Sequence, residues 1–238
     1  MKRATLALSL LLVAWSLAAC GAAGGSNAPA LTLGAAPWQD GEQAVYNVLD
    51  KNGSSVGTST FAFKSDGGAW VLSTHDALSS VDQGATIHID AQTLRPLSIE
   101  KTIKAQGTDA TVSATYPAGA GRLPIMAVVN GKNKSAAVDV PANLLDNDQL
   151  LMTLRAAPLA EGYQASFVNV VVANATKINT TVRVLGSETV TVPAGTFDAW
   201  KVELSFGGTQ QTAWYEQAAP HRLVQYQNAG SKLVLAKG

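Results

Sequence analysis

Two histidines and an aspartate are the residues in this 238-residue sequence whose types and spacing come nearest to a metal site. His75 and His88 lie in neighbouring segments of alternating hydrophobicity. A hairpin centred near residues 81–82 would place them opposite each other, with Asp90 on the same solvent-facing side. Two imidazoles and a carboxylate can hold zinc or copper.

The same three residues also fit a polar cross-strand patch on the wet face of a sheet. A register shift of one residue would separate the histidines, because it moves one of them to the other face. We favour the polar patch, so the sequence predicts no bound metal and no other cofactor. His75, His88 and Asp90 are the candidate ligands that a structure can test.

A serine pattern is the second candidate for chemistry. Residues 53–57, GSSVG, match the G-x-S-x-G motif of hydrolases, in which the serine sits on a sharp turn between a strand and a helix. Here the motif follows Asn52 and lies between two strand patterns, so Asn52-Gly53 is typical of a hairpin turn. The sequence contains no P-loop, dinucleotide fingerprint or H-E-x-x-H motif. We predict that the protein is not an enzyme.

The single cysteine, Cys20, stands directly behind a typical export leader. Residues 1–19 begin with Lys2 and Arg3, continue with a short apolar core and end in small residues. Residues 17–21, LAACG, resemble the bacterial lipoprotein box, which implies cleavage before the cysteine and diacylation of its thiol. We predict a lipoprotein signal peptide over residues 1–19 and lipidation at Cys20.

This lipid anchor predicts the location of the protein. Two or more acyl chains hold a protein stably on a membrane, whereas one gives marginal binding. Gly21 follows the cysteine where the usual inner-membrane retention signal has aspartate. The sequence therefore predicts a lipid-anchored protein on the extracytoplasmic side of the cell membrane or the outer membrane.

Composition indicates the domain organisation and limits the classes of partner that the protein can bind. Residues 20–40 are rich in Gly, Ala and Pro, which predicts a flexible tether, and residues 41–238 form the predicted single domain. Charged residues make up 14% of the chain and the formal net charge is zero, against roughly 25% charged residues in typical domains. No basic run attracts phosphates, so the chain is predicted to bind no nucleic acid.

Segments with a two-residue hydrophobic period follow one another from residue 44 to residue 236, separated by turn signals. Leu97, Ile99 and Ile103, for example, alternate with polar residues and are predicted to face inward. Helices do not alternate with strands, which excludes parallel βαβ units. The sequence predicts an all-β fold, an antiparallel meander that forms a barrel or a strongly curved open sheet.

One short helix is predicted near residues 146–157. Asp146 would cap it, Gln149 occupies the capping-box position and Pro158 ends it. The helix is expected to plug or cover one end of the curved sheet.

Residues 190–206, VTVPAGTFDAWKVELSF, hold two strand patterns around a turn at Pro193 and Gly195. The alternation places Trp200 inward and Ala199 outward. With the earlier run GEQAVYNVLDKNGSSVGTSTFAF and the closing run WYEQAAPHRLVQYQNAGSKLVLAKG, this corner resembles the bacterial family of exported domains of unknown function numbered 3108. The resemblance spans most of residues 41–238. It implies a β-barrel-like domain in the cell envelope and no catalytic residues.

These observations leave three hypotheses about function. The first is a non-catalytic, lipid-anchored β-barrel-like module that binds a lipid-like or other apolar ligand, with tryptophans and tyrosines lining a cavity or packing the core. The second is a structural or assembly lipoprotein that contacts another envelope protein or a polymer through its outer face and sheet edges. The third is a metal-dependent enzyme, for which His75, His88 and Asp90 are the candidates.

Overall fold

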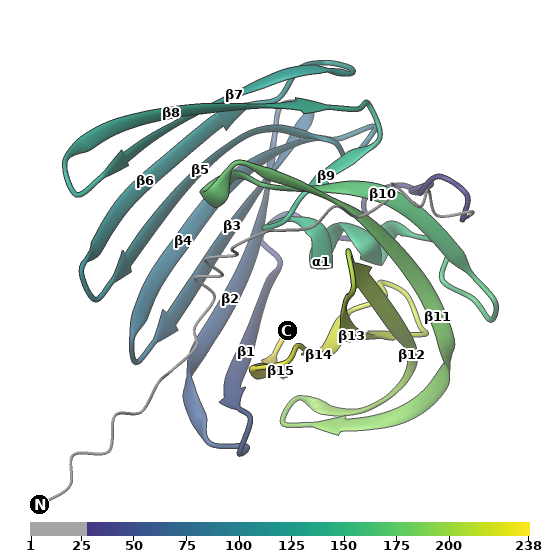
Figure 1. Ribbon diagram of the computed structural model, residues 1–238. Helices are drawn as coiled ribbons and strands as arrows, with labels where there is room; N and C mark the ends of the chain where they lie inside the picture. The colour runs from purple at the N-terminus through teal and green to yellow at the C-terminus, as the bar shows by residue number, and fades with distance from the viewer. Residues whose placement is uncertain (1–27) are drawn as a thin grey trace, which may run out of the picture.

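The computed structural model describes residues 28–238 (Figure 1). The predicted signal peptide and Cys20 lie outside the described residues. Within residues 28–238, no helix is both long and apolar enough to cross a membrane.

The described chain forms one 15-stranded sheet in the order β8-β7-β6-β5-β4-β3-β2-β1-β15-β14-β13-β12-β11-β10-β9. The first half of this sheet contains β1 (Gln43–Asp50), β2 (Ser55–Asp66), β3 (Ala69–Leu78), β4 (Val81–Asp90), β5 (Pro96–Ala105), β6 (Thr108–Thr115), β7 (Gly121–Val129) and β8 (Lys132–Val140). The second half contains β9 (Leu144–Asp146), α1 (Leu150–Thr153), η1 (Leu154–Ala156), β10 (Gln164–Val171), η2 (Val172–Asn174), β11 (Thr176–Val192), β12 (Gly195–Phe206), β13 (Thr209–Glu216), β14 (Leu223–Gln227) and β15 (Ser231–Lys237).

The sheet curls into a nearly closed, barrel-like shape, so the predicted all-β fold class is confirmed (Figure 1). Strands β1 to β8 pair antiparallel in chain order, and so do β10 to β15. β1 also pairs antiparallel with β15, whereas β9 pairs parallel with β10. The free edges, β8 and β9, are connected directly along the chain. Lys177 on β11 reaches across to β8, where its Nζ donates to the Asp139 carbonyl at 2.6 Å.

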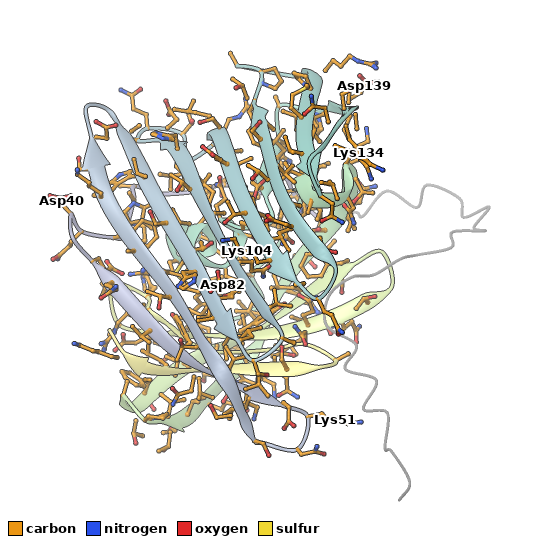
Figure 2. All side chains as sticks on the ribbon, turned by 90° about the vertical axis from the view of Figure 1, so that its left-hand side faces the viewer. Asp40, Lys51, Asp82, Lys104, Lys134 and Asp139 are labelled. Atoms are coloured by element: carbon orange, nitrogen blue, oxygen red, sulfur yellow. The ribbon has the colours of Figure 1, made fainter. Side chains whose placement is uncertain are left out.

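Alternation along the strands produces one filled core. In β2, Phe61 and Phe63 are buried, and in β4, Ile87 and Ile89 are fully buried, while their neighbours face outward. Burying one such side chain stabilises the fold by about 1.5–3 kcal/mol. Figure 2 looks at the outer surface of the N-terminal strands, where charged side chains such as Lys104 are widely spaced.

A β-bulge changes the predicted inward face of β5. The register shifts between His88–Ser98 and Ile89–Pro96, which leaves Leu97 as the extra residue. Leu97 is 41% exposed, so its predicted inward position is wrong, while Ile99 is buried as expected. The same face of β5 also buries Lys101.

The predicted helix is shorter than expected, and its cap is wrong. The α-helix spans Leu150–Thr153 and continues as the 3-10 turn η1, with Gln149 as the N-cap and no side-chain capping bond. Asp146 instead ends β9, because that strand pairs with β10. The helical segment packs its leucines into the core, and Figure 1 shows it enclosed between the two halves of the sheet.

The predicted flexible tether differs from the structure over residues 28–40. Leu31 donates its backbone N–H to the Ser166 carbonyl at 2.9 Å, and Gly34 donates to the Ala156 carbonyl at 2.8 Å. Trp38 is buried and stacks on Phe63, with 4.5 Å between ring centroids. Small residues permitted a flexible segment, but these bonds and the tryptophan fix this part of the chain to the barrel.

The corner between β11 and β12 turns at Pro193 and Gly195 as predicted. Trp200 is half-buried and packs against the core, whereas Ala199, predicted to face outward, is fully buried. This end of the hairpin folds back onto β15, where the Ala194 N–H bonds to the Leu235 carbonyl at 3.1 Å. The register of β11 and β12 shifts between Val184 and Gly186, so Ala199 falls on the covered face with Val190, while Thr191 and Thr196 on the other face stay exposed.

Candidate functional site

The structure separates the two histidines of the predicted metal site. The β3–β4 hairpin pairs His75 with Gly84 and His88 with Val71. The histidines share a face but are offset by four residues, or about 13 Å along a strand. The predicted cross-strand pairing is therefore wrong, because the turn lies two residues earlier than expected.

His75 and Asp90 each have a partner of their own. His75 Nε2 lies 3.2 Å from Asp82 Oδ2 on the exposed face. Asp90 Oδ1 accepts bonds from the Thr93 hydroxyl and backbone, which lower the pKa of Asp90. Asp90 therefore organises a turn. Across residues 28–238, no three His, Cys, Asp or Glu residues are grouped as metal ligands.

The G-x-S-x-G pattern forms a hairpin turn, as predicted. Asp50 Oδ1 accepts the backbone N–H groups of Asn52 at 2.8 Å and Ser54 at 2.9 Å. Gly53 has a φ of 82°, which suits glycine in a tight turn. The serine lies in neither the strand–helix setting nor the strained corner that a hydrolase needs.

The aromatic residues serve mainly to fill the core. Trp38 makes an edge contact with Trp70 at 6.1 Å between centroids, and Tyr46 makes one with Phe61 at 5.6 Å. Edge-to-face pairs of this kind add about 0.5–1.5 kcal/mol to the gain from burial. Core packing is therefore the use that these side chains have in the described fold.

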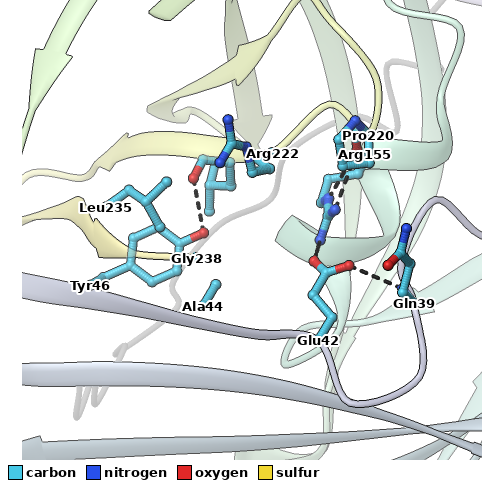
Figure 3. A pocket seen from close by; sticks show the side chains of 10 residues that line it. Gln39, Glu42, Ala44, Tyr46, Arg155, Pro220, Arg222, Leu235 and Gly238 are labelled. Atoms are coloured by element: carbon cyan, nitrogen blue, oxygen red, sulfur yellow. Dashed lines mark hydrogen bonds and ion pairs between the residues drawn. The ribbon is translucent and has the colours of Figure 1, made fainter. Parts of the chain in front are cut away.

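A pocket opens beside the seam between β1 and β15, and we call it the seam pocket (Figure 3). Its volume is about 230 Å³. One side is mostly apolar and is formed by Ala44, Tyr46, Leu223, Leu235 and Gly238. The other side is polar and is formed by Gln39, Glu42, Arg155 and Pro220, while Arg222 lies beside the apolar side (Figure 3).

Arg155 forms the inner polar end of the seam pocket. Only 2% of its side chain is exposed. Its Nη1 donates to Glu42 Oε1 at 2.5 Å, and its Nε and Nη2 donate to the Pro220 carbonyl at 3.4 and 3.3 Å. The Glu42 side chain is 21% exposed, and the Gln39 N–H holds its second oxygen at 3.1 Å. The cation is therefore buried, while its carboxylate partner stands nearer to water.

Arg222 stands on another wall of the seam pocket. Its Nε and Nη2 donate to the two Glu216 oxygens at 2.8 and 3.2 Å, and its guanidinium lies 4.9 Å from the centre of the Phe197 ring. The hydrogen bonds that Arg222 donates to Glu216 raise the pKa of Arg222. The planar side chain is thus held in place by an acid and a ring.

Tyr46 contributes a neutral phenol to the apolar wall. Its Oη donates to the Leu223 carbonyl at 2.9 Å, which joins β1 to β14 across the seam. Burial raises the pKa of Tyr46 well above its usual value. The phenol therefore keeps its proton.

A second buried polar cluster lies inside the barrel, and we call it the interior cluster. The Tyr116 hydroxyl donates to Asp146 Oδ2, and the Asp148 N–H donates to Asp146 Oδ1 at 2.7 Å. Lys101 Nζ lies 2.6 Å from Asp148 Oδ1. Burial, followed by the charge of Asp148, raises the pKa of Asp146 to about 7. This cluster ties the segment before α1 to β5 and β6.

Comparison with known families identifies the family of this chain. Residues 33–236 match the family described as "Protein of unknown function (DUF3108)". The chain belongs to the DUF3108 family. This confirms the resemblance inferred from the β11–β12 corner and the flanking runs. No curated protein matches the chain.

One solved structure shares the overall fold of this DUF3108 domain. The domain is similar to a β-barrel-like protein of domain of unknown function DUF1849 from Brucella abortus, with a TM-score of 0.51 and 10% identity over 82% of this chain and 95% of that one. This likeness concerns the fold.

Two further structures cover most of the chain at lower similarity. A candidate exported protein with a YmcC-like fold from Bacteroides fragilis has a TM-score of 0.33 and 14% identity over 87% of this chain and 99% of that one. A candidate lipoprotein from Parabacteroides distasonis has a TM-score of 0.34 and 13% identity over 84% and 96%.

Sequence reasoning missed both buried clusters of the DUF3108 domain. Lys101 has the same parity as Ile99, so the alternation already placed it inward. Arg155 interrupts an apolar run, which is a sign of a buried charge. Its partner Glu42 is 113 residues away, and nothing local pairs them.

Proposed function

We propose that this protein is a lipid-anchored, extracytoplasmic envelope protein whose β-domain is a non-catalytic binding module for a small apolar or amphiphilic molecule. The leader and the lipoprotein box at Cys20 support the anchor. The membrane is then the first partner, reached through the acylated N-terminus. The β-domain binds the small molecule.

The seam pocket is the observation that carries the binding role. It combines an apolar wall with a few fixed polar groups, as ligand sites generally do. Its volume of about 230 Å³ is below the roughly 300–1,000 Å³ of sites for drug-sized ligands, which favours a short ligand. The aromatic core is already packed and offers such a ligand less room.

No catalytic role is part of this proposal. Reactions need a nucleophile, a base or a metal held close to the substrate. The candidate histidines are separated along β3 and β4, and Ser55, the serine of the G-x-S-x-G pattern, begins strand β2 directly after a hairpin turn. The arginines of the seam pocket are suited to binding anions rather than to proton transfer.

Lipidation is tested by metabolic labelling with an alkyne fatty acid. We expect wild type to incorporate the label and to fractionate with membranes, whereas Cys20→Ser should do neither. An unlabelled wild-type protein that is nevertheless exported would contradict the anchor.

Ligand binding is tested by titrating the protein in nanodiscs with 1-octanol by calorimetry, with empty nanodiscs as the blank. Ala44→Trp should abolish binding because it fills the pocket. Ala137→Trp, on the exposed strand β8, is the matched control and should bind like wild type. Equal binding by the two variants would place the ligand elsewhere.

The outer face of the sheet favours a second candidate, an assembly lipoprotein that contacts another envelope protein or a polymer. Met126 and Val128 on β7 are 55% and 44% exposed, beside the free edge strand β8. Crosslinking in cells from position 126 should recover one reproducible partner. Recovery of none would contradict this alternative.

A further inference from the structure

We propose that the seam pocket is a carboxylate site, which takes an apolar monocarboxylate with its acid group on Arg155 and Arg222. This inference rests on the proposed binding function and adds the chemical class of the ligand. Its evidence is the unused hydrogen-bonding capacity of the two arginines and the position of Glu42.

The Arg155 guanidinium has N–H groups that its described bonds do not use. A guanidinium has five N–H groups, and the described bonds to Glu42 and Pro220 use one on each of its three nitrogens. One N–H on Nη1 and one on Nη2 have no acceptor among residues 28–238. These two terminal nitrogens form the edge that binds a carboxylate with two parallel bonds.

Arg222, directly before β14, supplies a further N–H donor. Its Nε and Nη2 are engaged by Glu216, while no described residue accepts from its Nη1. The bonds to Glu216 and the contact with Phe197 fix the guanidinium plane. An acid group in the pocket can therefore meet a preorganised cation without ordering a mobile side chain.

The free arginine N–H groups of the lining favour an anion. Arg155 and Arg222 are each paired with one acid, Glu42 and Glu216, so these four side chains together carry no net charge, and an anion is attracted by the N–H groups that the pairs leave free. Burial of Arg155 lowers the effective dielectric around it, which strengthens its attraction to an acid. A neutral or cationic molecule gains nothing from this arrangement.

The apolar wall selects the rest of the ligand. Tyr46, Leu223 and Leu235 are each at most 1% exposed and form a rigid surface beside the arginines. The Tyr46 hydroxyl is already committed to the Leu223 carbonyl, so this wall offers contact area and no free polar group. A short hydrocarbon chain fits it.

Glu42 already bonds one of the two terminal nitrogens of Arg155, Nη1, that a ligand acid would use. Its carboxylate bonds Arg155 through one oxygen, and its side chain lies at the wetter end of the pair. A ligand carboxylate that binds both terminal nitrogens of Arg155 would displace Glu42 toward water. Glu42 is thus a built-in competitor for the site, and its removal should strengthen binding.

The probe is sodium octanoate, titrated by calorimetry into the full-length protein in nanodiscs. The comparison ligands are 1-octanol, which is neutral, and octylamine, which is cationic; both have the same chain length as octanoate. At neutral pH we expect octanoate to bind with a Kd on the order of 0.1 mM, which lies within the affinity that a ligand of its size can reach. It should bind at least tenfold more tightly than 1-octanol, and octylamine should bind most weakly.

Three variants test the contributions of Arg222 and Glu42 one at a time, with a control. Arg222→Gln should weaken octanoate binding roughly tenfold, the usual loss for one hydrogen bond to a charged group, and leave 1-octanol binding unchanged. Glu42→Gln should tighten octanoate binding several-fold, because Gln cannot compete as an anion. Arg122→Gln is the matched control, since Arg122 is an exposed arginine on β7. It should bind like wild type.

Arg222→Lys covers the case in which Arg222→Gln does not fold, because it keeps the charge and loses the fixed Nη1 donor. It too should weaken octanoate binding. If 1-octanol and octanoate bind equally, the acid site is wrong while the proposed binding module stands. If neither binds to wild type, the proposed function itself fails. Tighter binding to wild type than to Glu42→Gln would overturn the exchange at Arg155.

Discussion

The seam pocket and the interior cluster both bury charged side chains, but they do so with opposite polarity. In the seam pocket the buried group is a cation, Arg155, and its acid partner Glu42 lies nearer to water, at 2% and 21% side-chain exposure. In the interior cluster the most deeply buried group is an acid, Asp146, which is bonded to the Tyr116 hydroxyl. The buried cation lines a pocket, whereas the buried acid lies inside the barrel.

This difference indicates what each region is for. The seam pocket has unused donors beside an apolar cavity, which is the pattern of a binding site. The interior cluster joins β5, β6 and the segment before α1 through bonds among its own members. We interpret its role as structural, because it holds these elements together. Breaking each cluster should therefore have different consequences.

The largest effect is expected from Arg155→Met. Removing one partner of a buried ion pair costs about 3–5 kcal/mol of unfolding free energy, because the other charge loses its compensation. Chemical denaturation measures the loss. The double change Arg155→Met with Glu42→Gln should recover part of it. A single variant as stable as wild type would show that the pair contributes little to the fold.

Lys101→Met should break the interior cluster at its cation. Lys101 Nζ lies 2.6 Å from Asp148, and both side chains are mostly buried, so we expect a loss of about 2 kcal/mol. Chemical denaturation again measures it. Octanoate binding at the seam pocket should stay unchanged, because the two clusters share no residue. Weakened binding would mean that the clusters are coupled.

Asp146→Asn should alter the pH dependence of stability. The pKa of Asp146 is raised to about 7 in the fold, so the folded state keeps this proton when the unfolded chain has lost it. The contribution of Asp146 is therefore greatest at low pH and is lost as pH rises from about 4 to 7.

Asn carries no such proton, so the variant should gain stability relative to wild type across this window. Denaturation at several pH values measures the difference between the two proteins, in which the other titrating groups are shared. A constant difference from pH 4 to pH 7 would contradict a raised pKa.

The smallest effect is expected at an exposed ion pair. Arg183 Nη2 lies 3.0 Å from Glu203 Oε1 across β11 and β12, but the Arg183 side chain is 57% exposed. Arg183→Gln should cost about 0.2–1 kcal/mol and become milder in salt. Thermal unfolding of this variant provides the baseline for the buried pairs. A cost as large as that of Arg155→Met would remove the contrast between buried and exposed pairs.

The strands could be predicted because their signal is local. Alternation in β2 and β4 places Phe61, Phe63, Ile87 and Ile89 inward, and the structure agrees. Register was predicted less well. The β3–β4 turn falls at Ser79 and Ser80, which carry no glycine or asparagine signal, and the two-residue error separated the proposed metal ligands.

The seam pocket could not be predicted because it depends on distant parts of the chain. Glu42, Arg155 and Arg222 come from the start of the domain, the turn after α1 and the β13–β14 connection. Only closure of the sheet through β1 and β15 brings these segments together. The cap at Asp146 failed for a related reason, because pairing of β9 with β10 outweighed a local helix signal.

The central claim is that an added carboxylate binds Arg155 in the seam pocket. A crystal structure of the protein grown with sodium octanoate tests it most directly. We predict an octanoate carboxylate about 2.7–2.9 Å from the terminal nitrogens of Arg155, with its chain along Tyr46 and Leu235 and with Glu42 turned toward water. An intact Glu42–Arg155 pair beside an empty pocket, at a concentration that saturates binding in solution, would contradict the account.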